Sequence, residues 1–238
     1  MLFKGFAEAT KIIDRGIIKL NVYKWPIITD IMVYEIEEYE NNIEIYDRNL
    51  GYSLKMNLSD DYCLEHQRIF FTYSNNDTGF LITARSINQY PKDINSFLSK
   101  PNLQYIEVGC GLGEFLPLII QKKKQTSSLP IAIDPANYEL MRDMLKYALT
   151  LNETKVINSN IDVLIDRINL FLDVRSIILL NKPLENIIDN HPKLIHFADG
   201  VVDNFGPHLY QTKFKNLTTR IECLEMRLLK HNGKLILG

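Results

Sequence analysis

Three alternate glycines, Gly109, Gly111 and Gly113, directly follow the apolar run QYIEV (104–108) and precede a helix-length apolar stretch (113–124). Glycine weakens the interior of a strand or helix, so glycines at this spacing favour a tight turn between two such elements. A buried strand that turns directly into a helix is typical of a parallel sheet, and ligands bind such sheets outside the carboxyl ends of the strands. The pattern therefore predicts an α/β fold with a ligand site at residues 109–113, the glycine loop.

Segments of strand length and helix length alternate from residue 101 to the end of the chain. The helical segments carry apolar residues at spacings of three and four, most regularly over 212–230. This alternation predicts right-handed crossovers between parallel strands, so we expect residues 101–238 to form a Rossmann-like, doubly wound parallel sheet. The predicted strands are 104–108, 130–134, 176–180, 194–198 and 234–238. The predicted helices are 113–124, 137–149, 160–172, 183–189 and 212–230, the last of which Gly233 ends.

Residues 1–100 have a different texture. Residues 1–20 are predicted to form a helical lead-in. From residue 21 to residue 87, short runs rich in Ile, Tyr, Val and Phe are separated by Asn, Asp, Ser and Gly. Alternating apolar residues, such as Leu54 and Met56, favour half-buried antiparallel strands. We therefore predict a small β-rich N-terminal region without a catalytic motif.

The composition excludes several classes of protein. The chain has 238 residues, of which 46% are hydrophobic and 24% charged, close to the average for globular domains and unlike a disordered chain. Its formal net charge is −2, which disfavours a surface dedicated to nucleic acid because such a surface is usually basic.

Cysteine usage and hydropathy predict the compartment. Cys63, Cys110 and Cys223 are widely spaced and include no C-x-x-C pair, so neither a disulfide framework nor a structural zinc site is expected. No 18 consecutive residues are apolar, and charged residues interrupt the N-terminal segment, so neither a membrane span nor a signal peptide is expected. We expect a soluble, cytoplasmic protein that does not bind a membrane.

The glycine spacing narrows the kind of ligand. A dinucleotide fingerprint is G-x-G-x-x-G, whereas this chain has G-x-G-x-G with Glu114 at the place of the third dinucleotide glycine. A negative charge at the start of the helix disfavours a pyrophosphate there and favours a neutral or cationic ligand. Asp134 follows 21 positions after Gly113, where an acid can accept hydrogen bonds from both hydroxyls of a ribose. A less favoured alternative is that Asp134 caps a helix, because an Asp-Pro pair is a good helix start at any strand-to-helix junction. The combination predicts an adenosine-containing ligand.

Three segments resemble class I S-adenosylmethionine (SAM)-dependent methyltransferases. EVGCGLG (107–113) resembles the family's first motif, an acid and a gap followed by G-x-G-x-G. IAIDPANYELM (131–141) is similar to the second motif, and LLKHNGKLIL (228–237) resembles the segment that enters strand five. The three segments occur in the family's order across 104–238, so the resemblance implies SAM as the cofactor and methyl transfer as the activity.

The resemblance also implies cofactor-binding residues. Glu107 would orient the loop or meet the methionine end of SAM, the three glycines would form the floor, and Asp134 would hold the ribose. The residue after strand three would lie at the edge of the adenine. With strand three at 176–180 this residue is Asn181, and with strand three at 155–157 it is Asn158. The implied cofactor-binding set is Glu107, Gly109, Gly111, Gly113, Asp134 and Asn181.

The candidate catalytic residues follow the predicted fourth strand, where the family places substrate contacts. Asp199 is predicted to lie at the mouth of the site, and Asp203 and His208 are the alternatives. A base is needed where the methyl acceptor is a poor nucleophile. The segment has no Asn-Pro-Pro-Tyr-type signature of amino-group methylation and no clear metal site. The expected substrate is a small-molecule methyl acceptor.

Two other functions remain open. One is a non-catalytic or partner-dependent SAM-binding module, because the family usually continues for a helix and two strands beyond strand five. A homo-oligomer or a partner chain would then cover the edge of that strand, unless the sequence is a fragment. The other is a nicotinamide-dependent oxidoreductase, which Glu114 and the glycine spacing disfavour.

Overall fold

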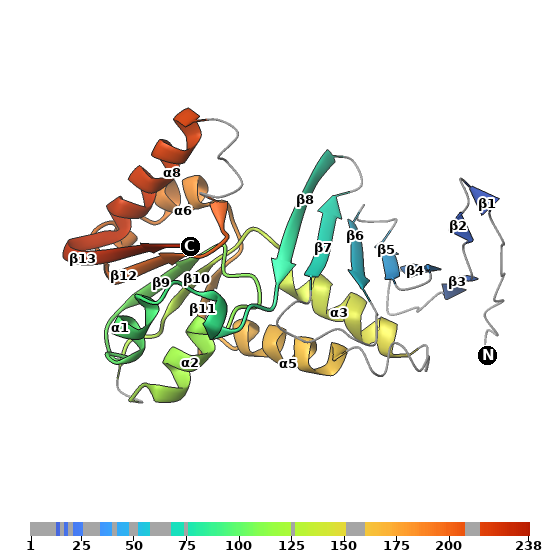
Figure 1. Cartoon of the computed structure of the whole chain (residues 1–238), viewed down its shortest axis with the longest axis horizontal. Coiled ribbons are helices and arrows are strands. Elements are labelled where there is room, and N and C mark those ends of the chain that lie inside the picture. Colours follow the sequence, from blue (N-terminus) through green and yellow to red (C-terminus); the bar gives the residue numbers. More distant parts are fainter. Residues whose placement is uncertain are drawn as a thin grey trace. The chain divides into compact units, whose positions relative to one another are not determined.

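The computed structural model describes residues 84–124, 127–150, 160–207 and 215–238 (Figure 1). Before residue 84 it describes eight strands. The chain divides into two compact units, which we describe separately. The first unit comprises residues Met1–Thr83 and Glu139–Asp166, and the second comprises Ala84–Tyr138 and Arg167–Gly238. Residues 84–100, which the sequence analysis placed with the N-terminal region, thus belong to the second unit.

The first unit contains a six-stranded antiparallel sheet in which the strands follow chain order. Leu54 and Met56 are buried and Lys55 between them is exposed, as the alternating pattern predicts. Two further short strands, β1 (Ile13–Asp14) and β2 (Ile17–Ile18), pair within the stretch predicted as a helical lead-in, most of which lies outside the described residues. The sheet consists of β3 (Asn21–Trp25), β4 (Tyr34–Tyr39), β5 (Asn42–Asp47), β6 (Tyr52–Asn57), β7 (Arg68–Tyr73) and β8 (Asn76–Thr83).

Two of the described helices contribute to this first unit. They are α3 (Tyr138–Leu149) and the first half of α5 (Ile161–Leu172). Both coincide closely with predicted helices, and their apolar stripes are buried as expected for amphipathic helices. The buried positions of the predicted stripes are Leu140, Met141, Met144, Leu145, Ala148, Ile161, Leu164, Ile165 and Ile168.

The second unit is a mixed α/β fold around a five-stranded, all-parallel sheet, which is consistent with the predicted Rossmann-like sheet. The strand order is β11-β10-β9-β12-β13, so the chain begins in the middle, builds one side and then crosses to the other. The order reverses between β9 and β12, and ligands of such sheets bind at this switch point, beyond the carboxyl ends of the strands. The strands are β9 (Tyr105–Val108), β10 (Ile131–Ile133), β11 (Ile178–Leu180), β12 (Ala198–Asp203) and β13 (Leu229–Leu237).

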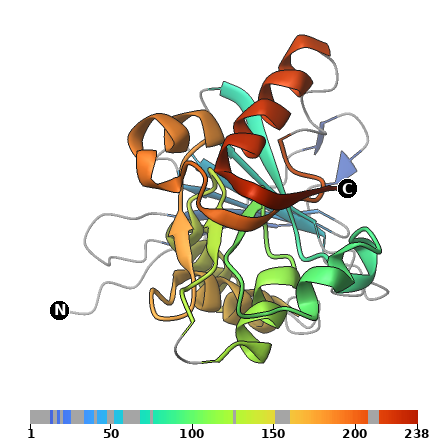
Figure 2. The ribbon, with the colours of Figure 1, turned by 90° about the vertical axis from the view of Figure 1, so that its left-hand side faces the viewer.

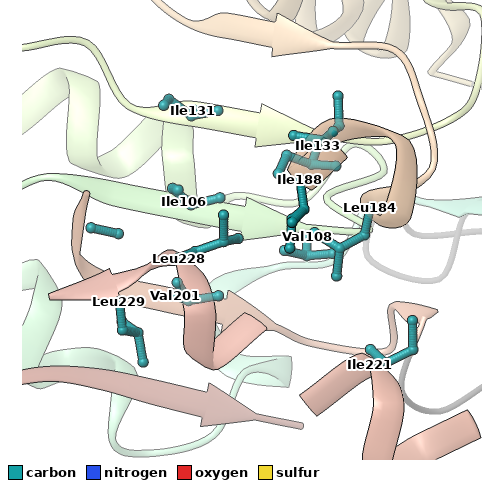
Figure 3. Packing of buried hydrophobic residues seen from close by; sticks show 12 residues of the cluster. Ile106, Val108, Ile131, Ile133, Leu184, Ile188, Val201, Ile221, Leu228 and Leu229 are labelled. Atoms are coloured by element: carbon teal, nitrogen blue, oxygen red, sulfur yellow. The ribbon is translucent and has the colours of Figure 1, made fainter. Parts of the chain in front are cut away.

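Helices flank both faces of this sheet (Figures 1 and 2). On one face, α6 (Leu184–Asn190) and α8 (Lys215–Leu228) bury an aliphatic cluster that includes Ile106 and Val108 of β9 (Figure 3). Side chains alternate along a strand, so Tyr105 points to the other face. There it packs against Phe97 and Phe115, with ring centroids 4.9 and 5.8 Å away. These two rings belong to α1 (Ile94–Leu98) and α2 (Phe115–Lys122). Two short 3-10 helices, η2 (Ile87–Gln89) and η3 (Pro192–Leu194), complete the unit.

The prediction of strand four at 194–198 is wrong. The strand β12 begins at Ala198 and ends at Asp203, after η3. Gly200 lies within this strand. Glycine is required at this position because any side chain would collide with the ring of Phe97. A Cβ at this position would lie 2.6 Å from Phe97 Cζ.

The role predicted for Gly233 is also wrong. The helix α8 ends at Leu228 and the strand β13 begins at the next residue, so Gly233 lies inside β13. The register between β12 and β13 shifts between Ala198 and Gly200. A Cβ on Gly233 would lie 2.8 Å from Leu229 Cδ2, which explains the glycine without a helix end.

Substitution of Gly200 by alanine should destabilise the second unit by about 1–3 kcal/mol, because the added methyl group overpacks the contact with Phe97. Urea unfolding measures this loss. The double variant Gly200→Ala/Phe97→Ala should lose less than the sum of the two single changes, because the smaller side chain relieves the collision. Additive losses would contradict this explanation of the glycine.

Candidate functional site

The glycine loop adopts a backbone that only glycine accepts easily. Gly109 and Gly111 have φ angles of +61° and +50°, in the left-handed region. A Cβ on Gly109 would lie 2.6 Å from Gly206 Cα, so the turn after β12 presses directly against the loop. At Gly113 the reason is steric, because a Cβ would collide with the Tyr90 hydroxyl. All three predicted glycines are therefore required by the local structure.

Asp134 joins the glycine loop to the end of β10. Its side chain is 3% exposed, and its Oδ2 and Oδ1 accept hydrogen bonds from the N–H groups of Gly111 and Ala136, each at 2.9 Å. Burial raises the pKa of Asp134, and the two hydrogen bonds oppose that shift. Asp134 lies four residues before the helix that begins at Tyr138, so it is not the helix cap considered in the sequence analysis, and its side chain instead closes a turn at Ala136. Each oxygen still has capacity for a second hydrogen bond.

Glu107 lies in the centre of the sheet with 0% exposure. Its Oε1 accepts a hydrogen bond from the Tyr90 hydroxyl at 2.7 Å, and its Oε2 has no hydrogen-bond partner among the described residues. Burial raises the pKa of Glu107 to about 7, against the opposing effects of the Arg85 charge and the Tyr90 hydrogen bond. A carboxyl that titrates near neutral pH and keeps one oxygen unpaired is suited to receive a polar ligand group.

Arg85 is a site residue that the sequence analysis missed. It is 4% exposed, and its Nη2 donates to Gly109 O and Cys110 O at 3.0 and 3.3 Å. Its Nε and Nη1 have no hydrogen-bond partner in the described part of the chain. Its guanidinium carbon lies 5.8 Å from the centre of the Tyr90 ring and 5.9 Å from that of Phe205. No motif surrounds this arginine in the sequence, and only the fold brings it to the glycine loop.

Glu114 has a structural role that its position in the sequence did not reveal. Its Oε1 accepts a hydrogen bond from Arg167 Nη2 at 2.8 Å, and its Oε2 accepts one from the Ile87 N–H at 2.9 Å. The same guanidinium donates to Leu112 O at 2.8 Å. The charge of Glu114 is therefore paired, which weakens the argument that it repels a pyrophosphate.

The carboxyl end of β12 brings Asp203 beside the glycine loop. Asp203 pairs in register with Val108, is buried, and accepts a hydrogen bond from the Gly206 N–H at 2.7 Å. Asn204, the next residue, is also buried, and neither amide atom has a hydrogen-bond partner among the described residues. Of the three predicted catalytic candidates, Asp203 is the one that the structure brings to the site.

Asp199 lies at the opposite end of β12 from the glycine loop, because the strand starts and ends later than predicted, so that Asp199 is near its beginning and not beyond its end. Lys230 Nζ and the Gln104 N–H each donate to its carboxylate at 2.8 Å. Although partial burial acts in the other direction, these hydrogen bonds hold the pKa of Asp199 below its usual value. The predicted place of Asp199 at the mouth of the site is wrong. His208 lies outside the described residues.

Asn181 follows β11, the third strand, so the placement of that strand at 176–180 is confirmed to within two residues. Its side chain is exposed and its Nδ2 donates to Ala136 O at 2.6 Å. This bond brings Asn181 to the loop that follows Asp134. The alternative strand at 155–157 and its Asn158 lie outside the described residues.

No family model, curated protein or solved structure matches this chain. Among the described residues, no group of three or more His, Cys, Asp and Glu side chains is placed to hold a metal ion. Within the same part of the chain, every helix is too short or too polar to cross a membrane.

Charge is concentrated at the carboxyl ends of the strands. The buried charged residues in the described part of the chain are four acids and one base, and all except Glu225 of α8 lie at or beside the glycine loop. Buried ionisable groups are rare and tend to mark functional sites. Burial and the neighbouring Asp203 raise the pKa of Glu225 to about 10, so this acid is neutral near pH 7. The remaining carboxyls still exceed the single guanidinium, which favours a ligand with a positive charge. The five residues are Arg85, Glu107, Asp134, Asp203 and Glu225.

Substitution of Glu107 by glutamine should flatten the dependence of stability on pH. The pKa of Glu107 is about 7 in the folded protein and about 4.5 when exposed, so the folded state favours the neutral carboxyl. The contribution of Glu107 to the free energy of unfolding is therefore complete below pH 4.5 and is lost as the pH rises through 7. The loss is at most about 3 kcal/mol. Urea unfolding between pH 4.5 and 7.5 should show a smaller decline for Glu107→Gln than for the unmodified protein. The same change at half-buried Glu185 should leave the decline intact, and equal slopes for all three proteins would contradict the assignment.

Proposed function

We propose that this protein binds S-adenosylmethionine at the glycine loop and transfers its methyl group to a small-molecule acceptor. The observation that supports this most directly is the excess of buried carboxyls over one buried arginine at the switch point of a parallel sheet. A dinucleotide would bring the negative charges of a pyrophosphate to these acids. SAM instead brings a sulfonium and an ammonium group, together with one carboxylate for the arginine.

The residues present are suited to this cofactor. Glu107 Oε2 and Arg85 Nε and Nη1 are buried polar atoms without hydrogen-bond partners among the described residues, and such atoms are costly unless a ligand uses them. We assign the ammonium group of SAM to Glu107 and its carboxylate to Arg85. The glycines of the loop have no Cβ and would let the ligand approach the backbone. Asp134 would accept hydrogen bonds from the ribose hydroxyls, and Asn181 would lie at the edge of the adenine.

SAM supplies a methyl group on a positively charged sulfur. When the acceptor forms its bond to the methyl carbon, the sulfur keeps the electrons of the broken carbon–sulfur bond and leaves as a neutral thioether. The protein then has to hold the acceptor in line with the methyl group and keep water away. An acceptor that is a poor nucleophile also has to lose a proton. Asp203 is the proposed proton acceptor, with His208 as the further candidate from the sequence, and Asp199 is no longer proposed.

Calorimetry with SAM, S-adenosylhomocysteine and NADH tests the ligand class. We expect both adenosyl sulfur compounds to bind at least tenfold more tightly than NADH. Tight binding of NADH alone would overturn the proposal in favour of a nicotinamide enzyme. Binding of both sulfur compounds without methyl transfer to any acceptor would restrict the proposal to a SAM-binding module.

Asp134→Asn should weaken the binding of S-adenosylhomocysteine at least tenfold, equivalent to about 1.4 kcal/mol. The reason is that a carboxylate accepts hydrogen bonds with two oxygens, whereas an amide has one oxygen that accepts. Asp199→Asn is the matched control, since it makes the same change at the other end of the sheet and should leave the affinity unchanged. Thermal melting of both variants separates lost binding from lost folding. Equal affinities for the two variants would remove the ribose assignment.

Arg85→Gln should discriminate between two ligands that share an adenosine. S-adenosylhomocysteine carries an amino-acid carboxylate, whereas 5′-methylthioadenosine does not. The affinity for the first should fall at least tenfold through loss of a charge-assisted contact, worth about 1.5–3 kcal/mol. The affinity for 5′-methylthioadenosine should stay nearly constant, which also shows that the site remains folded. A parallel loss of both ligands would contradict the carboxylate assignment.

A further inference from the structure

Glu225 is a carboxyl on the buried face of α8. It lies four residues after Ile221 and three before Leu228, both of which belong to the aliphatic core cluster, and it is 0% exposed. Burial of a carboxyl among apolar side chains is unfavourable unless it is neutral or hydrogen-bonded. An acid is therefore kept at a position where the helix pattern favours an apolar residue.

Among the described residues, the groups that shift the pKa of Glu225 are two other carboxyls, Asp203 on β12 and Glu222 on its own helix. No N–H or O–H group among the described residues donates to either Glu225 oxygen. Ionised carboxylates only accept hydrogen bonds, so a hydrogen bond between Glu225 and Asp203 requires a proton on one of them. Burial and the charge of Asp203 raise the pKa of Glu225 to about 10, which places the proton on Glu225.

Asp203 in turn holds the turn of residues 204–207. Its Oδ1 accepts a hydrogen bond from the Gly206 N–H at 2.7 Å. Gly206 is packed so closely that a Cβ on it would lie 2.7 Å from Val108 O, and its own Cα lies 2.6 Å from the place of a Cβ on Gly109. Any displacement of the Asp203 carboxylate is therefore transmitted to the turn and to the glycine loop.

We propose that Glu225 is a positioning residue, which as a neutral acid donates a hydrogen bond to Asp203 and thereby holds the 204–207 turn against the glycine loop. It acts through Asp203 and has no direct contact with the proposed ligand. This role concerns the free protein and does not depend on the identity of the ligand. Loss of the shared proton would bring two carboxylates together, and their repulsion would release the turn.

The pH range of this effect follows from the charges that surround the pair. Asp203 faces Glu225 from β12, Glu222 lies on α8, and Glu107 on β9 interacts with Asp203, so every one of these neighbours is an acid. When the pH rises and Glu225 loses its proton, the new negative charge is repelled by all of these acids. Glu107, with a pKa of about 7, is almost fully ionised above pH 8.5, whereas Glu225, with a pKa of about 10, loses most of its proton between pH 8.5 and 10.5. The range from pH 8.5 to 10.5 therefore follows the Glu225–Asp203 pair.

The test follows the Gly206 amide by NMR. Phe205-Gly206 is the only Phe-Gly pair in the sequence, so labelling with carbonyl-13C phenylalanine and 15N glycine selects a single amide signal. Between pH 8.5 and 10.5 this signal should shift in the unmodified protein and stay constant in Glu225→Gln, whose amide donates at every pH. Glu222→Gln, the same substitution at another acid of the same helix, should keep the shift.

Glu225→Met separates positioning from simple packing, because methionine fills a similar volume but donates no hydrogen bond. Its Gly206 signal should be displaced already at pH 8.5, and between pH 8.5 and 10.5 its melting temperature should decline less than that of the unmodified protein. A Gly206 signal that does not move in the unmodified protein, or that is the same in Glu225→Met and Glu225→Gln, would overturn the proposal. Neither measurement needs a ligand, so failure of SAM binding leaves this test intact.

Discussion

The close approach of two backbone turns, at Gly109 and Gly206, is the constraint on which the rest of the site depends. Parallel strands of one sheet end at the same edge, so β9 and β12 deliver their following turns to one place. A side chain at either glycine would push the turns apart. Because the turns are in contact, the carboxyls of Glu107, Asp134 and Asp203 are close enough to influence one another, as the pKa of Glu107 shows.

The buried charges oppose the stability of the fold and are compensated locally. Asp134 receives two backbone N–H groups, Glu107 receives a tyrosine hydroxyl, and Arg85 donates to two backbone carbonyls of the glycine loop. Each group nevertheless retains capacity for further hydrogen bonds, and two of them keep atoms with no hydrogen-bond partner among the described residues. A site that is only partly satisfied in this way is more stable when a complementary ligand binds, because binding to the folded state alone shifts the folding equilibrium.

The sequence predicted the features that depend on residues close together in the chain. The glycine loop, the third strand and the buried stripes of α3 and α5 depend on turn chemistry and apolar spacing, and the structure has them close to the predicted positions. The fourth strand was predicted too early in the chain, which also misplaced Asp199, because the glycine inside this strand, Gly200, packs against the ring of Phe97, a partner distant in sequence. Arg85 lacks any local signal. Glu225 had one, an acid between Ile221 and Leu228 on an apolar stripe, but its partner Asp203 becomes visible only in the fold.

Phe205 combines two unfavourable properties. Its φ angle is +59°, a left-handed conformation that costs a residue with a Cβ about 1 kcal/mol or more, and its ring is 46% exposed to water. Glycine or asparagine would satisfy that backbone at less expense, so the benefit has to come from the ring itself. The centre of the ring lies 5.9 Å from the guanidinium carbon of Arg85, which is itself 4% exposed. In this screened position the cation interacts more strongly with any anion that reaches it than it would in open water.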